Sequence, residues 1–241
     1  MTALFISDLH LDASRPAATD CFLRFLAGPA RDAGTLYILG DLFEAWTGDD
    51  SPGPHEIEIL AALRRYTSTG RHCQFLRGNR DFLVGQRFAA EAGAVLLPDE
   101  ALEDLDGTRV LLMHGDTLCT DDHAYLRYRS LVHNSVAQAV YLALPARVRT
   151  GIAGYARRRS SAANAGKPPA IMDVNAEAVV DALRRHQVQV MIHGHTHRPA
   201  VHALQVDGRM ARRIVLGDWY TQGSVLQWTP AGPELRTLAF D

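Results

Sequence analysis

The sequence predicts an α/β fold with largely parallel strands, and three observations lead to this prediction. Short apolar runs typical of buried strands alternate with segments whose apolar residues recur at three- and four-residue spacing. The 241-residue chain is 47% hydrophobic and 22% charged, so it can bury a sizeable core and is not disordered. Five of the apolar runs are followed by polar clusters that contain Asp, Asn or His, as expected where parallel strands present a ligand site.

The predicted elements follow in chain order. The strand-like runs are 3–6, 36–39, 73–76, 95–97, 110–113, 188–192, 214–216 and 225–228. Helix-like stretches cover 19–27, 55–66 and 85–91, and Thr19 or Asp20 could cap the first of them. Turn signals at Asp207-Gly208 and at 230–233 predict antiparallel pairing near the end of the chain.

Residues 122–168 interrupt this alternation and predict an inserted helical subdomain. The core would then comprise 1–121 and 169–241, with a return to the core near Ile171. The insertion carries eight basic residues against the single acid Asp122, around a mostly apolar stretch at 131–144. The basic residues are Arg127, Arg129, Arg147, Arg149, Arg157, Arg158, Arg159 and Lys167. A solvated basic face over an ordinary helical pair is the alternative interpretation.

Composition narrows the classes of function. A formal net charge of −2 argues against a nucleic-acid partner, which would need a broad basic surface. Three cysteines are too few for a disulfide framework and favour a reducing compartment. The N-terminal MTALFISDLH does not resemble a signal peptide, and no run of about 18 apolar residues predicts a membrane span. No protein partner is predicted.

The polar clusters after the strands offer a mixed oxygen and nitrogen ligand set. The sequences are SDLH at 7–10, GDLFE at 40–44, RGNRD at 77–81, HGD at 114–116 and HGHTH at 193–197. Without an obvious thiolate, the set favours Mn²⁺, Fe²⁺, Co²⁺ or Zn²⁺ over a cysteine-zinc site. The candidate ligands are Asp8, His10, Asp41, Asn79, His114, His195 and His197.

Seven ligands exceed what one tetrahedral ion needs, so the sequence predicts two ions that share Asp41. In an extended segment, residues i and i+2 point to the same face about 6.6 Å apart, which pairs Asp8 with His10 and His195 with His197. Each residue alone has a structural alternative, such as a helix cap for Asp41. The prediction depends on their conjunction.

These segments resemble, in order, the D-x-H, GD-x-x-E, GN-x-D/E, H-G-D and G-H-x-H motifs of the calcineurin-like metallophosphoesterases. The resemblance implies a four-layer α-β-β-α sandwich with a two-metal site. It implies one ion held by Asp8, His10, Asp41 and His197, and another held by Asp41, Asn79, His114 and His195.

Longer stretches are similar to one family within this group, the UDP-2,3-diacylglucosamine pyrophosphohydrolases of lipid A biosynthesis. These stretches are SDLHLD, GDLFEAWTGDD, LRGNRDFL, LLMHGDTLCTDD, IMDVN, IHGHTHRP and VLGDWY. The resemblance implies cleavage of a UDP-linked diacylated sugar lipid to UMP and 2,3-diacylglucosamine 1-phosphate. Water would attack the α-phosphorus with two Mn²⁺ ions present.

The same resemblance implies which residues contact the substrate. They are Asn79, Arg80, Asp122, Tyr125, Ser160, Asn164, Lys167 and His195, with catalytic roles for Asn79, Arg80 and His195. Arg80 would stabilise charge on the phosphoryl oxygens, although an ion pair with Asp81 is its alternative. Asn134-Ser135-Val136 departs from the Asn-Pro-Trp-like step of the family, which affects only the shape of the lipid pocket.

The composition of the insertion predicts the cellular location of the protein. Residues 122–168 would form a lid for the lipid substrate, in which the apolar stretch could line acyl chains and the basic residues would attract anionic headgroups. We therefore expect a peripheral protein on the cytoplasmic face of the bacterial inner membrane. Two rival functions are a phosphoesterase acting on a soluble nucleotide and a non-catalytic scaffold on the same fold.

Overall fold

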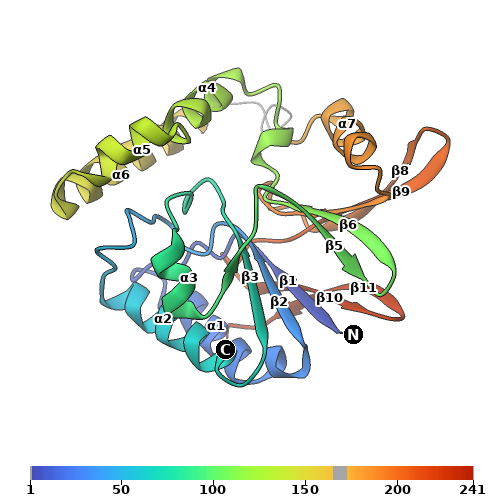
Figure 1. The fold of residues 1–241 in the computed structure, drawn as a ribbon, viewed down its shortest axis with the longest axis horizontal. Coiled ribbons are helices and arrows are strands. Elements are labelled where there is room, and N and C mark those ends of the chain that lie inside the picture. Colours follow the sequence, from blue (N-terminus) through green and yellow to red (C-terminus); the bar gives the residue numbers. More distant parts are fainter. Residues whose placement is uncertain (1, 165–172, 241) are drawn as a thin grey trace.

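Two β-sheets form the centre of the molecule (Figure 1). The computed structural model describes residues 2–164 and 173–240. The first sheet has six strands in the order β11-β10-β1-β2-β3-β4, with β1, β2, β3 and β4 parallel and β10 and β11 antiparallel to their neighbours. Its strands are β1 (Ala3–Ile6), β2 (Thr35–Leu39), β3 (His72–Leu76), β4 (Val95–Leu96), β10 (Gly223–Thr229) and β11 (Gly232–Leu238).

The second sheet has five strands in the order β5-β6-β7-β9-β8. Strands β6, β7 and β9 run parallel, and β5 and β8 close the two edges in antiparallel pairs. Its strands are β5 (Glu100–Leu105), β6 (Thr108–Met113), β7 (Val190–His193), β8 (Ala200–Val206) and β9 (Arg209–Val215).

Helices cover the outer faces of both sheets, so the molecule has the predicted four α-β-β-α layers. Helices α1 (Pro16–Ala27), α2 (Pro54–Thr67) and α3 (Gln86–Ala92) pack on the first sheet. Helix α7 (Ala176–His186) packs on the second sheet. Two short 3₁₀ turns, η1 (Pro29–Asp32) and η2 (Asp116–Leu118), complete the core.

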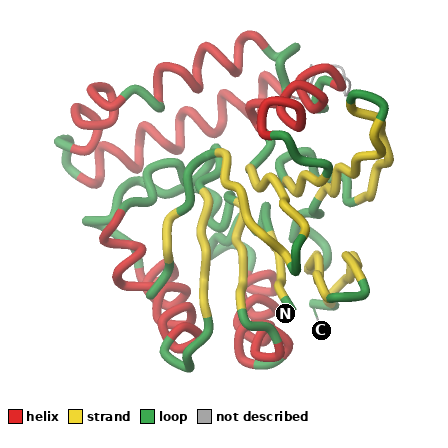
Figure 2. The backbone as a smooth tube through the Cα atoms, turned by 45° about the vertical axis from the view of Figure 1, so that its right-hand side comes forward, coloured by secondary structure: helices red, strands yellow, loops and turns green. Residues whose placement is uncertain are grey.

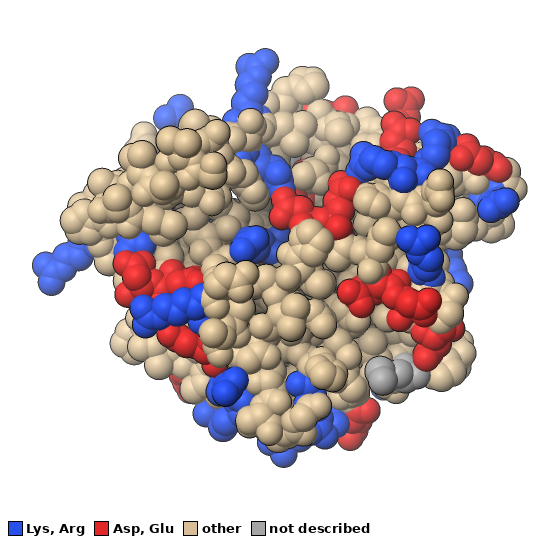
Figure 3. Space-filling model, viewed as in Figure 1, with Lys and Arg blue, Asp and Glu red and all other residues tan. Residues whose placement is uncertain are grey.

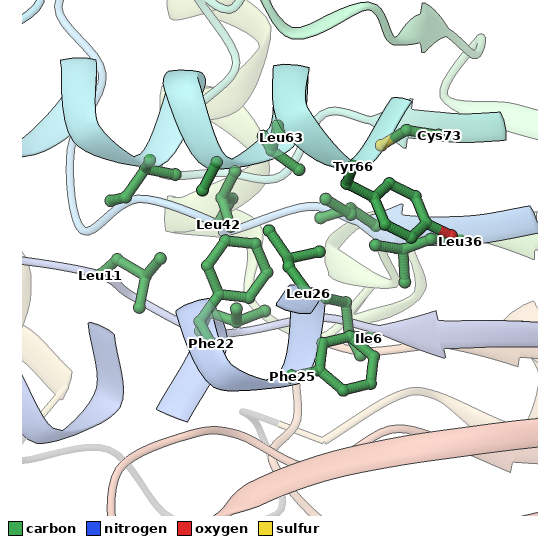
Figure 4. Close-up of a cluster of buried hydrophobic side chains, with 14 of the residues drawn as sticks. Ile6, Leu11, Phe22, Phe25, Leu26, Leu36, Leu42, Leu63, Tyr66 and Cys73 are labelled. Atoms are coloured by element: carbon green, nitrogen blue, oxygen red, sulfur yellow. The ribbon is translucent and has the colours of Figure 1, made fainter. Parts of the chain in front are cut away.

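Three apolar clusters hold these layers together. Figure 4 shows part of the first, where Phe22 and Leu26 of α1 lie in one cluster with Leu63 of α2 and Ile6 of β1. A second cluster lies between the sheets and includes Phe5 and Ile192, both fully buried. Each buried aliphatic or aromatic side chain stabilises the fold by about 1.5–3 kcal/mol relative to exposure, so the packing fixes the relative position of the two sheets.

The order and type of the predicted strands and helices are confirmed, and the differences have local causes. Helix α1 begins at Pro16, with Arg15 at its N-cap, so the prediction that Thr19 or Asp20 caps it is wrong. A proline at the first helical position has its φ preset for a helix and needs no hydrogen bond from its nitrogen. The predicted turn at Asp207-Gly208 joins β8 to β9, and both residues have positive φ.

Residues 123–164 are helical, as predicted, and form α4 (His123–Val132), α5 (Ser135–Leu142) and α6 (Ala146–Asn164). Figure 2 shows them lying across the loops that follow the carboxyl ends of the strands. Asn134 caps α5 by accepting hydrogen bonds from the amides of Val136 and Ala137. The predicted return near Ile171 lies outside the described residues. The domain limits and the role of these helices as a lid stay predictions.

Candidate metal centre

Side chains from both sheets converge beyond the carboxyl ends of β1, β2, β3, β6 and β7. Nε2 of His10 lies 3.3 Å from Nε2 of His197, and Oδ1 of Asp8 lies 3.3 Å from the same atom of His197. The possible ligand atoms of Asp8, His10 and His197 lie within 4.8 Å of one another. Since imidazole nitrogens repel one another without a proton or cation between them, this spacing suits one metal ion.

A second group adjoins the first. Ligand atoms of Asp8, Asp41 and His114 also lie within 4.8 Å of one another. Oδ1 of Asn79 lies 2.9 Å from Nε2 of His114 and 2.9 Å from Nδ1 of His195. The structure therefore brings all seven predicted ligands together.

Asp41 lies between the two groups. Its Oδ2 is 3.8 Å from Nε2 of His10 and 3.7 Å from Nε2 of His114. Its Oδ1 accepts a hydrogen bond from the amide of Arg80 at 2.8 Å. This position is the one that a shared carboxylate between two ions would need.

Five of the seven predicted ligands have a left-handed backbone. Asp8, His10, Asp41, His195 and His197 have φ values of 54°, 48°, 54°, 67° and 56°. The expectation that Asp8/His10 and His195/His197 lie in extended segments is therefore wrong. Left-handed φ is unfavourable for residues with a side chain and persists where the surrounding structure over-determines it, as at ligand clamps.

Two glycines let the backbone pass close to the carboxylates of Asp41 and Asp8. A Cβ on Gly78 would lie 2.2 Å from Oδ1 of Asp41, and a Cβ on Gly194 would lie 2.2 Å from Oδ2 of Asp8. Any side chain at either position would collide with a candidate ligand.

Asp81 is a structural residue that the sequence analysis did not assign. It is fully buried and accepts hydrogen bonds from the amides of Asp41, Leu42 and Gly78. It therefore joins the loop after β2 to the loop after β3. The alternative in which Arg80 pairs with Asp81 does not hold, because the Asp81 oxygens are directed to these amides. The sequence feature that could have identified Asp81 is its carboxylate two residues after the candidate ligand Asn79.

Burial shifts the protonation of the cluster in a way that favours a cation. Burial, with the charges of Asp81 and Asp8, raises the pKa of Asp41 to about 7. Burial lowers the pKa of His114, but the carboxylates of Asp41, Asp8 and Asp116 outweigh it and raise the value to about 9. Positive charge is thus drawn to this cluster, and divalent ions would supply it.

Unpaired lone pairs point to the same conclusion. Oδ1 of Asp8 is buried and has no hydrogen-bond partner among the described residues, whereas its Oδ2 accepts from Ser7 and from the amide of His195. His114 donates from Nδ1 to the carbonyl of Leu39, which leaves Nε2 as the ligand atom. These residues fit divalent cations in donor type and orientation.

Carboxylates near the cluster are tied to the helices above it. Oε2 of Glu44 lies 3.4 Å from Nδ1 of His10. Oε1 of the same residue lies 3.0 Å from Nε of Arg157 on α6. Asp116 accepts hydrogen bonds from Tyr125 and Arg129 of α4. Helices α4 and α6 therefore touch groups directly behind the candidate ligands.

The predicted substrate-contacting residues are only partly brought to the centre. Tyr125 lies near it, with its ring centroid 6.1 Å from that of His195. Asp122 is the N-cap of α4 and accepts from the amide of Tyr125. Nε of Arg80 is buried and has no partner among the described residues.

The remaining predicted contacts lie in α6 and beyond. Ser160 is exposed on α6, and Asn164 lies at the end of that helix. Lys167 lies outside the described residues. The roles of these three residues as substrate contacts stay predictions.

Comparison with known proteins places this centre in a family. The family model for calcineurin-like phosphoesterases matches residues 1–199. Proteins named UDP-2,3-diacylglucosamine hydrolase from Klebsiella pneumoniae and Escherichia coli O81 are 56% and 55% identical to this chain over 240 residues, and each alignment covers both chains fully. A protein of the same name from an Enterobacter strain is 52% identical over the same length. The converging ligands and these matches agree, and the chain belongs to the calcineurin-like phosphoesterase family of metal-dependent hydrolases.

Proposed function

We propose that this chain hydrolyses the pyrophosphate bond of UDP-2,3-diacylglucosamine to UMP and 2,3-diacylglucosamine 1-phosphate in lipid A biosynthesis. The observation that carries the proposal is the complete seven-residue cluster, in a chain more than 50% identical along its whole length to proteins named for hydrolysis of that substrate.

The cluster would hold two divalent ions, for which we propose Mn²⁺. Asp8, His10, Asp41 and His197 would hold one, and Asp41, Asn79, His114 and His195 the other. When bound, the ions would neutralise the pyrophosphate oxygens and lower the pKa of a water molecule that attacks the α-phosphorus.

The chain's own residues have three further tasks. The backbone amide of Arg80 donates to Asp41, and its guanidinium, whose Nε has no partner among the described residues, would stabilise charge on the phosphoryl oxygens. The amide oxygen of Asn79 lies 2.9 Å from a ring nitrogen of His114 and of His195, which gathers these three side chains where the second ion would bind. Burial lowers the pKa of His195 to about 4, so its imidazole is neutral at pH 7 and can accept a cation or a proton.

Helices α4, α5 and α6 would line the acyl chains. Their exposed apolar side chains include Leu131, Val136, Val140, Ile152 and Tyr155. Figure 3 shows that the surface over these helices is largely uncharged, with acidic and basic atoms gathered between it and the core. An exposed apolar surface beside a cluster of charged groups suits a substrate that has acyl chains and a pyrophosphate.

This apolar surface also supports a peripheral position on the anionic inner membrane, where the lipid substrate resides. In the described part of the chain, no helix combines the length and apolar character needed to cross a bilayer. We propose that the exposed apolar residues enter the headgroup region while the sheets stay outside it.

Turnover in ¹⁸O-labelled water tests the proposed reaction. The Mn²⁺-loaded chain is incubated with UDP-2,3-diacylglucosamine, and the products are analysed by mass spectrometry. The proposal predicts ¹⁸O in UMP, and label in the sugar phosphate would contradict attack at the α-phosphorus. Dinucleoside polyphosphates and cyclic nucleotides serve as competing substrates, and faster cleavage of either would favour a soluble-nucleotide phosphoesterase.

A further inference from the structure

A pocket lies on the outer face of the second sheet, beside the turn that carries His195 and His197. Its volume is about 230 Å³, several times the roughly 30 Å³ share of one water molecule. Arg213 and His202 are register partners on β9 and β8, so they project from the same face of the sheet. That face continues into the cluster that includes Ala211 and is covered by α7.

The charges around this pocket are unbalanced among the described residues that line it. Arg198, His202 and Arg213 line it together with a single carboxylate, Asp173. Asp173 is already committed, because its Oδ2 lies 2.5 Å from Nη1 of Arg198. Arg213 is therefore left as the guanidinium without a matching acid among the described residues that line the pocket.

Two buried polar atoms at this pocket lack partners. Nη1 of Arg213 and Oγ1 of Thr196 are each inaccessible to solvent and have no hydrogen-bond partner among the described residues. Burial also lowers the pKa of Arg213, with Asp173 opposing the shift. A buried guanidinium nitrogen without an acceptor is costly, which indicates that an acceptor is supplied from outside.

We propose that this pocket binds a phosphate group, carried by a nucleotide or present as inorganic phosphate. A tetrahedral oxyanion presents several acceptors to the planar fork of Arg213 and could also accept from Thr196. The site differs from the candidate metal centre, although Thr196 lies in sequence between two candidate metal ligands. It does not depend on the identity of the hydrolysed substrate.

Isothermal titration of inorganic phosphate into the full-length chain tests this site. The Arg213→Gln variant is expected to bind at least about tenfold more weakly, as for loss of a charged hydrogen bond. Arg212→Gln is the matched control, because this exposed neighbour projects from the opposite face of β9, and its binding should be unchanged. Unchanged binding in Arg213→Gln would overturn the proposal.

A variant of the metal centre distinguishes phosphate bound in this pocket from phosphate bound at the metal centre. Asp41→Ala should keep the phosphate affinity of the pocket even when hydrolysis fails. Loss of binding in Asp41→Ala with retention in Arg213→Gln would place the phosphate at the metal centre and refute the pocket. Should Arg213→Gln not fold, Arg213→Lys keeps the charge but loses the fork, and it should still bind more weakly than the unmodified chain.

UMP and uridine identify the source of the phosphate group. Tighter binding of UMP than of inorganic phosphate, lost in Arg213→Gln, would assign the site to a nucleotide. Equal affinities would assign it to free phosphate. Uridine that displaces phosphate with the affinity of UMP would show that the pocket does not recognise phosphate.

Discussion

At the scale of single residues, burial and metal binding have opposite effects on the charge of Asp41. Its carboxylate is buried beside Asp8 and Asp81, yet both candidate ions would need it charged. In the metal-free chain the pKa of Asp41 is about 7, above its ordinary value of 3.8. A raised carboxyl pKa means that the folded state binds a proton more tightly than the unfolded state, so this group costs stability as pH rises from about 4 to 7.

The effect of Asp41→Asn on the melting temperature should therefore have opposite signs without and with metal. Without metal at pH 8, it should melt a few degrees above the unmodified chain, because the buried charge is gone. With Mn²⁺, it should lose the stabilisation by metal and at least about a hundredfold in turnover, more than is usual for groups outside the ligand shell. Calorimetry with and without EDTA measures the first effect. A lower melting temperature than the unmodified chain at pH 8 in EDTA would contradict this account.

Arg80 provides the second test at this scale. Replacement by Gln should lower kcat by about 10²–10³ while metal content stays the same, since the guanidinium acts on the developing charge. Arg87→Gln is the control, because Arg87 is exposed and pairs with Glu91 on α3. Metal analysis and steady-state kinetics are measured on both variants. Loss of metal in Arg80→Gln would show that Arg80 maintains the metal centre and does not act on the developing charge.

At the scale of elements, three arginines fasten the inserted helices to the core. Arg129 of α4 pairs with Asp116 and Asp99, and Arg157 of α6 pairs with Glu44. Arg149 of α6 is only 1% exposed, and its Nη1 donates to the carbonyl of Thr47 and to Asp50, both at 2.8 Å. The basic residues of the insertion are thus partly neutralised by the core and do not form one free basic face.

Removal of the Arg149 contact should loosen α5 and α6. The Arg149→Met variant should show faster amide hydrogen exchange in both helices and a raised KM for the lipid substrate, with kcat little changed. The loss in stability should be about 1 kcal/mol, because Asp50 is 60% exposed and solvent weakens that ion pair. Arg147→Met, two residues away and exposed, is the control. Equal exchange rates in the two variants would show that the contact does not position the helices.

The elements also show which features can be predicted from sequence. Buried strands such as β2 and β7 stand out as apolar runs, and the Asp and His residues that follow them become candidate ligands through the conjunction of the five polar clusters. Strands β5 and β8 were not predicted, because these edge strands are partly exposed and mix charged or polar residues with apolar ones. Left-handed φ at Asp8 or His197, and the buried position of Arg149, arise from tertiary contacts that a single sequence does not reveal.

At the scale of the whole molecule, the two sheets share one site. The first sheet supplies Asp8, His10, Asp41 and Asn79, and the second supplies His114, His195 and His197. The cluster between the sheets holds these halves together, and the hydroxyl of Tyr37 on β2 donates to Glu103 on β5 at 3.0 Å. The site therefore depends on the packing of the whole core.

The apolar outer surface of the inserted helices makes a prediction about membranes. The chain should float with liposomes that contain anionic lipid at low salt, and the Val136→Asp/Val140→Asp variant should float less, because both valines are more than 60% exposed. Ile57→Asp, at an exposed position on α2, is the control and should float like the unmodified chain. Full recovery of the unmodified chain in the soluble fraction would count against membrane association.

The central claim is that residues from both sheets hold a pair of metal ions, and anomalous X-ray diffraction at the manganese edge measures this directly. Crystals of the Mn²⁺-loaded chain should show two peaks, one touching His10 and His197 and the other touching His114 and His195, with Asp41 between them. A single peak, or peaks away from these side chains, would contradict the account.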